Sequence, residues 1–91
     1  MRHITDGRLD GIEPLLEELR KVPTLVERKR GVFYRSSRAF LHFHEDGDDV
    51  YADVRLQGDD FDRRCVTARN AQRVLVRDVR ALVAGAPRAR R

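Results

Sequence analysis

The chain has 91 residues and a mass of 10.6 kDa, which is enough for one small domain over residues 1–91 with a single core. Hydrophobic residues make up 41% and charged residues 37%, which excludes a low-complexity disordered chain and a membrane span. The formal net charge is +4, with 10 Lys/Arg against 13 Asp/Glu in residues 1–60 and 9 Arg against 2 Asp in residues 61–91. The C-terminal third is therefore the basic part.

The first predicted element is a helix over residues 10–21, after a loose lead-in at residues 1–8. Apolar residues recur every three or four positions in this segment: Leu9, Ile12, Leu15, Leu16, Leu19 and Val22. Asp10 is placed to cap the helix, and Pro14 falls in its first turn, where a missing N–H costs little. Pro23 ends it.

The period then changes to two, which predicts four strands. They are expected at residues 31–35, 38–44, 49–56 and 61–66. Two-residue turns are predicted at Ser36-Ser37 and Asp46-Gly47, and Asp-Gly is a strong hairpin signal because both central residues of a type I′ turn need positive φ.

A turn centred on Asp46-Gly47 would pair His44 with Asp49 and His42 with Tyr51. The two central strands then separate into an apolar face and a polar or aromatic face, as a half-buried sheet requires. The apolar face is Ala39, Leu41, Phe43, Val50, Ala52 and Val54. The opposite, outer face carries Phe40, His42, His44, Asp49, Tyr51 and Asp53, joined by Phe33 across the Ser-Ser turn.

A second helix is predicted over residues 68–84, capped by Thr67 and stopped by Gly85 and Pro87. Its buried stripe is Ala71, Leu75, Val79, Leu82 and Val83. Four arginines fall on another face: Arg69, Arg73, Arg77 and Arg80. Residues 86–91 form a basic tail.

The predicted fold class is α+β, a two-layer sandwich in the order α-β-β-β-β-α. It contains an antiparallel four-stranded meander with two helices packed on one face.

The leading functional hypothesis is a non-enzymatic binding or self-association module that uses the outer sheet face. Its residues would be Phe33, Phe40, His42, His44, Tyr51 and Arg55. Exposed rings mark an interface unless a loop covers them, and a homodimer through the sheet is the simplest assembly. No nucleophile elbow, phosphate loop or dinucleotide motif is present, so no catalytic residue and no cofactor are predicted.

The last of three ranked hypotheses is metal binding by His42 and His44, which a strand places on one face about 7 Å apart. Asp49 is the expected third ligand, and Glu45 and Asp53 are further candidates. The alternative is that the two histidines on the open face are solvated or paired with a residue across the strands.

The hypothesis ranked second, before metal binding, is phosphate-backbone binding by Arg69, Arg73, Arg77 and Arg80 with the basic tail. An acidic protein is the other partner that this charge favours, and arginines on a solvated helix face give the same pattern.

Two further features have structural interpretations. Cys65 is the single cysteine, and we expect it to be a small buried hydrophobe. Asp53, Arg55, Asp62 and Arg64 are expected to form an ion-pair lattice on the outer side of the sheet, with a catalytic or anion-binding cluster as the alternative.

The stretch Ala39-Phe-Leu-His-Phe-His-Glu, followed by Tyr51-Ala-Asp-Val-Arg-Leu and a Phe-Asp-Arg strand, resembles small actinobacterial α+β proteins of no known activity. The resemblance covers about residues 31–83 and implies a fold and a bacterial source. The N-terminal residues lack the apolar run of a signal peptide, so a cytoplasmic location without membrane contact is expected.

Overall fold

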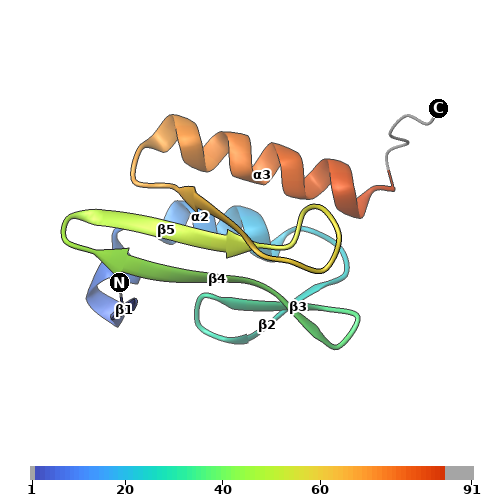
Figure 1. The fold of residues 1–91 in the computed structure, drawn as a ribbon, viewed down its shortest axis with the longest axis horizontal. Coiled ribbons are helices and arrows are strands. Elements are labelled where there is room, and N and C mark those ends of the chain that lie inside the picture. The colour runs from blue at the N-terminus through green and yellow to red at the C-terminus, as the bar shows by residue number, and fades with distance from the viewer. Residues whose placement is uncertain (1, 86–91) are drawn as a thin grey trace.

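An antiparallel sheet of six strands forms one layer of the protein, and helices α2 and α3 pack on one of its faces (Figure 1). The computed structural model describes residues 2–85. Strands β2 to β6 lie side by side in chain order, and β1 pairs with β4. This is the predicted α+β sandwich, with two more strands than the sequence indicates. No helix in the described part of the chain is long and apolar enough to cross a membrane.

The N-terminal segment is more ordered than predicted. Residues 1–8 are expected to be a loose lead-in, but β1 (Arg2–His3) pairs with β4 and α1 (Asp6–Asp10) follows at once. The Glu45 carboxylate accepts a hydrogen bond from the Thr5 backbone N–H at 2.7 Å, and the Thr5 hydroxyl caps α1. A buried carboxylate on β4 therefore anchors this segment.

The single helix predicted over residues 10–21 is in fact two helices, α1 and α2 (Glu13–Arg20), separated at Gly11 and Ile12. Pro14 does lie in the first turn of α2. The apolar stripe spans both helices and all six of its members are buried, so the packing was predicted correctly although the break was not.

Strand β2 (Leu25–Lys29) is an edge strand that the sequence does not indicate, and it pairs with β3 (Val32–Arg35). Gly31 lies between them with φ +80°. A Cβ atom there would lie 3.0 Å from Leu9 Cδ2, so this turn packs directly against α1.

The hairpin of β4 (Arg38–Asp46) and β5 (Asp49–Val54) turns one residue later than predicted. Asp46 lies opposite Asp49, so the turn residues are Gly47 and Asp48. Gly47 has φ +61° and Asp48 does not have positive φ, which is the type II′ pattern with glycine first. Asp46-Gly47 and Gly47-Asp48 are both favoured two-residue hairpin turns, so the local sequence does not choose between them.

This change shifts the pairing by two residues and leaves the two faces intact. Leu41 now lies opposite Val54 and Phe43 opposite Ala52, and all four are buried under the helices. Only Ala39 of the predicted apolar face is not fully buried.

A β-bulge between β3 and β4 overturns the predicted position of two aromatic rings. The Ser36-Ser37 turn is correct, since Arg35 lies opposite Arg38, but Phe33 then lies opposite Leu41 rather than Phe40. Phe40 is the extra residue in β4. Phe33 is fully buried and Phe40 is 3% exposed, so both belong to the core and neither forms an open aromatic patch.

Strand β6 (Asp62–Cys65) and α3 (Arg69–Val83) complete the fold, close to the predicted bounds. Gly85 ends α3 with φ +69°, as expected. Thr67 does not cap α3: its hydroxyl accepts from the Val50 N–H and donates to the Asp49 carboxylate. The tail at residues 86–91 lies outside the described residues.

Candidate metal centre

His42, His44 and Asp53 converge on the open face of the sheet, the face turned away from α2 and α3. His42 and His44 alternate along β4, and Asp53 lies directly opposite His42 on β5. The Asp53 Oδ2 atom lies 3.4 Å from His42 Nε2 and 3.1 Å from His44 Nε2. One ligand atom from each residue falls within 4.8 Å of the others.

The two distances to Asp53 Oδ2 are close to those between neighbouring ligand atoms of one metal ion. A tetrahedral ion with bonds of about 2.0–2.1 Å holds neighbouring ligand atoms about 3.3–3.4 Å apart. The two imidazole rings are 4.9 Å apart between centroids and nearly perpendicular, at 82°. The three side chains can therefore converge on one ion with small rotamer changes.

Arg63 on β6 fixes the orientation of the Asp53 carboxylate. Its guanidinium binds both oxygens, with Nε 2.7 Å from Oδ1 and Nη2 2.9 Å from Oδ2. Each carboxylate oxygen has a further lone pair, so Oδ2 can accept this bond and still face the imidazoles. Arg63 therefore orients the Asp53 carboxylate from the strand on the other side of β5 from the histidines. Side chains that bind metal ions are commonly held by hydrogen-bond partners of this kind.

The protonation states also suit a metal. The Arg63 guanidinium holds the pKa of the Asp53 carboxyl below its ordinary value, so Asp53 is ionised at neutral pH. Burial, followed by the neighbouring His44, lowers the pKa of the His42 imidazole below its ordinary value. A neutral imidazole and an ionised carboxylate are the forms that coordinate metal ions.

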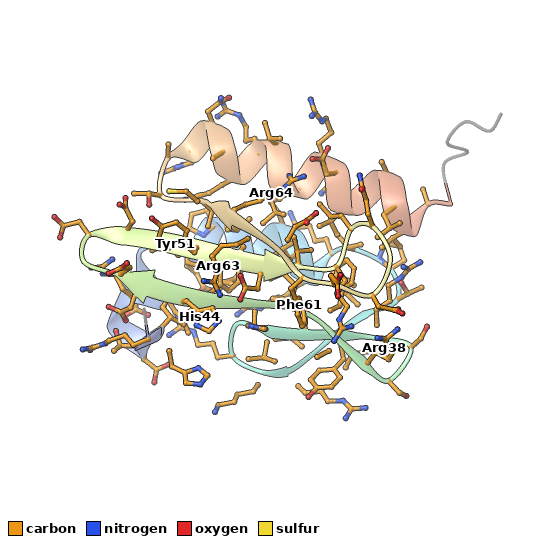
Figure 2. The ribbon with its side chains drawn as sticks, in the orientation of Figure 1. Arg38, His44, Tyr51, Phe61, Arg63 and Arg64 are labelled. Atoms are coloured by element: carbon orange, nitrogen blue, oxygen red, sulfur yellow. The ribbon has the colours of Figure 1, made fainter. Side chains whose placement is uncertain are left out.

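Other polar and aromatic residues surround the cluster on the same face. Figure 2 shows His44, Tyr51, Arg63 and Phe61 along the exposed side of β4, β5 and β6. Phe61 packs edge-on against the His42 ring at 4.9 Å. On the other side of the cluster, His3 of β1 lies opposite His44, with ring centroids 5.7 Å apart.

The third ligand predicted from the sequence is wrong in this structure. Asp49 lies opposite Asp46, not His44, because the turn is one residue later. Its carboxylate accepts a hydrogen bond from Thr67 instead. Glu45 points to the buried side and binds Thr5, so of the three acidic candidates only Asp53 joins the histidines.

The expected self-association surface loses its two main rings. With Phe33 and Phe40 in the core, the remaining members of that set on the open face are His42, His44, Tyr51 and Arg55, all half-buried. Val26 is the only large hydrophobic residue that is exposed within residues 2–85. A homodimer stays a prediction that these rings no longer support.

The four arginines of α3 line a groove of about 580 Å³ between α2 and α3. Arg80 pairs with Glu18 at 2.7 Å and Arg77 contacts Asp78 at 3.3 Å. Glu17 and Glu18 stand on the α2 side, and carboxylates there would repel a phosphate backbone. Nucleic-acid binding at this helix also stays a prediction.

The expected ion-pair lattice is arranged differently. Asp53 pairs with Arg63, while Arg64 faces the helices and pairs with Asp78 of α3 at 2.7 Å. Cys65, predicted to be buried, lies exposed opposite Tyr51.

Sequence reasoning missed Arg63 and His3. β6 is a short edge strand whose Asp-Arg-Arg-Cys sequence has no apolar alternation to show which side faces the core. The two residues of β1 are too few to give any periodic signal. The position of Arg63 could have been predicted from Val66, an apolar residue that is buried at the end of this segment. Side chains alternate along a strand, so a buried Val66 places Arg63 on the outer face.

Comparisons with protein-family models, with curated proteins and with solved structures found no match to this chain.

Proposed function

We propose that this protein binds one divalent transition-metal ion of the zinc class through His42, His44 and Asp53. The observation that carries the proposal is the position of Asp53 Oδ2, 3.1 and 3.4 Å from the two imidazole nitrogens. Histidine nitrogen with a carboxylate oxygen is a donor set that suits zinc and its neighbours rather than calcium or magnesium.

The rigidity of the platform supports the proposal. Both histidines and the aspartate lie within paired strands in the middle of the sheet, and their neighbours Leu41, Phe43 and Ala52 are buried. Strands hold ligand positions more precisely than loops do, so little ordering is needed on binding. Three protein ligands on an open face leave a fourth coordination position for water or an exogenous ligand.

The alternative is a purely structural cluster in which protonated histidines pair with Asp53. Burial lowers the pKa of His42 below its ordinary value, which argues against an ion pair between a protonated His42 and Asp53 at neutral pH. Asp53 also has an ion-pair partner in Arg63 already, so it does not need a second cation for its own charge.

The test is a zinc titration monitored by isothermal calorimetry, on protein from which a chelator has first removed any bound metal. The expected result is one ion per chain, with affinity reduced at least tenfold in His42→Gln, His44→Gln and Asp53→Asn. The matched control is Asp49→Asn, which removes a carboxylate from the same strand outside the cluster and should bind zinc as the wild type does.

Circular dichroism of each variant checks that the fold is kept. The proposal is wrong if wild-type protein takes up no zinc, or if zinc binding is unchanged by both histidine substitutions. Loss of binding in Asp49→Asn with retention in Asp53→Asn would instead support the ligand set that the sequence alone suggested.

A further inference from the structure

A small cationic pocket lies at the other end of β4 from His44, beside the Ser36-Ser37 turn. Its volume is about 200 Å³ and it is lined by Arg35, Arg38, Arg55, Phe40, Ser36 and Gly58. The pocket joins the β3–β4 turn to the loop that follows β5, two segments far apart in the sequence. Figure 2 shows Arg38 and Phe61 in this part of the sheet.

The pocket has an excess of positive charge. Among the described residues, only one carboxylate lies within ion-pair distance of any of these three guanidinium groups. It is that of Asp59, which lies 3.0 Å from Arg38. Arg35 and Arg55 have no carboxylate partner within the described part of the chain, although both are half-buried. Three guanidiniums close together repel one another, and an anion between them removes that repulsion.

Arg55 is held in place for such a role. Its guanidinium lies over the Phe61 ring, 4.1 Å from the centroid, and it donates a hydrogen bond to the backbone carbonyl of Asp59. Its Nε atom is buried and has no hydrogen-bond partner among the described residues. A buried donor without an acceptor is uncommon in proteins, so the chain by itself leaves the Arg55 guanidinium incompletely hydrogen-bonded.

We infer that this pocket binds a phosphate-type oxyanion. Arginine forks recognise phosphate oxygens with paired hydrogen bonds, and three of them around one anion make a charge-assisted site. The volume is below the range of pockets that enclose drug-sized ligands, so the pocket takes a phosphate group rather than a whole nucleotide. Free phosphate and the phosphate of a monoester share this chemistry.

The experiment uses metal-free wild-type protein in a chelator, so that its outcome is independent of the proposed zinc site. Proton–nitrogen correlation spectra, including the arginine Nε–H signals, are recorded while inorganic phosphate replaces chloride at constant ionic strength. Saturable shifts are expected at the Arg55 Nε–H and at the backbone amides of Ser36, Ser37 and Gly58. A parallel titration with phenyl phosphate distinguishes the two sources. Shifts of the same signals mean that the pocket accepts a phosphate monoester, whereas shifts with inorganic phosphate alone mean that it accepts only the free ion.

Arg35→Ala and Arg38→Ala should each weaken binding at least fivefold, because each removes a charge from the rim and neither carries the Phe61 stack. The matched control is Arg69→Ala, which removes the same charge from α3, outside this pocket, and should leave binding unchanged. Non-saturating shifts that chloride reproduces, or equal weakening by Arg69→Ala, would show general charge screening and overturn the inference.

Discussion

Phe33 lies directly opposite Leu41 across β3 and β4, and both side chains are fully buried. The Ser36-Ser37 turn by itself would place Phe33 opposite Phe40, on the outer side. The bulge at Phe40 inserts one extra residue into β4, so that Tyr34 lies opposite Ala39 but the next residue of β3, Phe33, lies opposite Leu41. One inserted residue therefore moves two aromatic rings from a predicted interface into the core.

Phe33→Ala should destabilise the protein by about 3–5 kcal/mol, since it removes a fully buried ring and leaves a cavity. Val26→Ala is the control, because Val26 is 55% exposed and its truncation should change the free energy of unfolding by no more than about 0.5 kcal/mol. Urea denaturation followed by circular dichroism measures both. Equal small effects would mean that Phe33 faces solvent, as the sequence suggested.

Ser36 and Ser37 both have positive φ, at 54° and 68°, which is the type I′ conformation. Serine is strained there, and Asn-Gly is the preferred pair. The double substitution Ser36→Asn with Ser37→Gly should raise the free energy of unfolding by about 1 kcal/mol. A lower midpoint in urea would contradict the assigned turn.

Gly31 and Gly7 form a matched pair for glycine-to-alanine substitution. Gly31 has φ +80° and a Cβ there would crowd Leu9, so Gly31→Ala should cost about 1–2 kcal/mol or more. Gly7 lies within α1, and a Cβ added there would meet no atom within 4 Å, so Gly7→Ala should stabilise by about 0.4–1 kcal/mol. Thermal unfolding of the two variants should shift the midpoint in opposite directions.

Glu45 should contribute stability that depends on pH. The backbone N–H of Thr5 holds the pKa of this carboxyl below its ordinary value, so the folded state favours the ionised form. The unfolded chain then binds more protons in acid, and stability from Glu45 is present above about pH 4.5 and lost as pH falls through the lower folded pKa.

Glu45→Gln should therefore lower the free energy of unfolding at pH 7. The difference in free energy between this variant and the wild type should become smaller towards pH 3, as measured by urea denaturation across that range. Glu17→Gln removes a carboxylate at an exposed position of α2; it is the control and should change the free energy of unfolding at pH 7 by no more than about 0.5 kcal/mol. A constant difference between Glu45→Gln and wild type at every pH would refute the role of its charge.

Apart from Phe40 at the bulge, the sequence by itself determined which residues of β4 and β5 face the helices and which face outward. Side chains alternate along any strand, so a shift of two in the pairing of β4 with β5 does not move a side chain to the other face. The apolar stripe of α1 and α2 was equally local, since it depends on helical period alone. In α3 the buried residues are Gln72, Leu75, Val76 and Val79, and of these only Leu75 and Val79 were predicted. Both histidines of the candidate metal centre could therefore be placed in advance.

Only the tertiary structure decided which carboxylate meets them. That choice depends on whether the turn begins at Asp46 or Gly47, and it exchanges Asp49 for Asp53. Both are favoured two-residue turns, so the local sequence does not choose between them. The bulge at Phe40 and the pairing of β1 depend on contacts between segments distant in the chain, which no periodic pattern records. Alternation is a property of each strand alone, whereas register and bulges are properties of strand pairs.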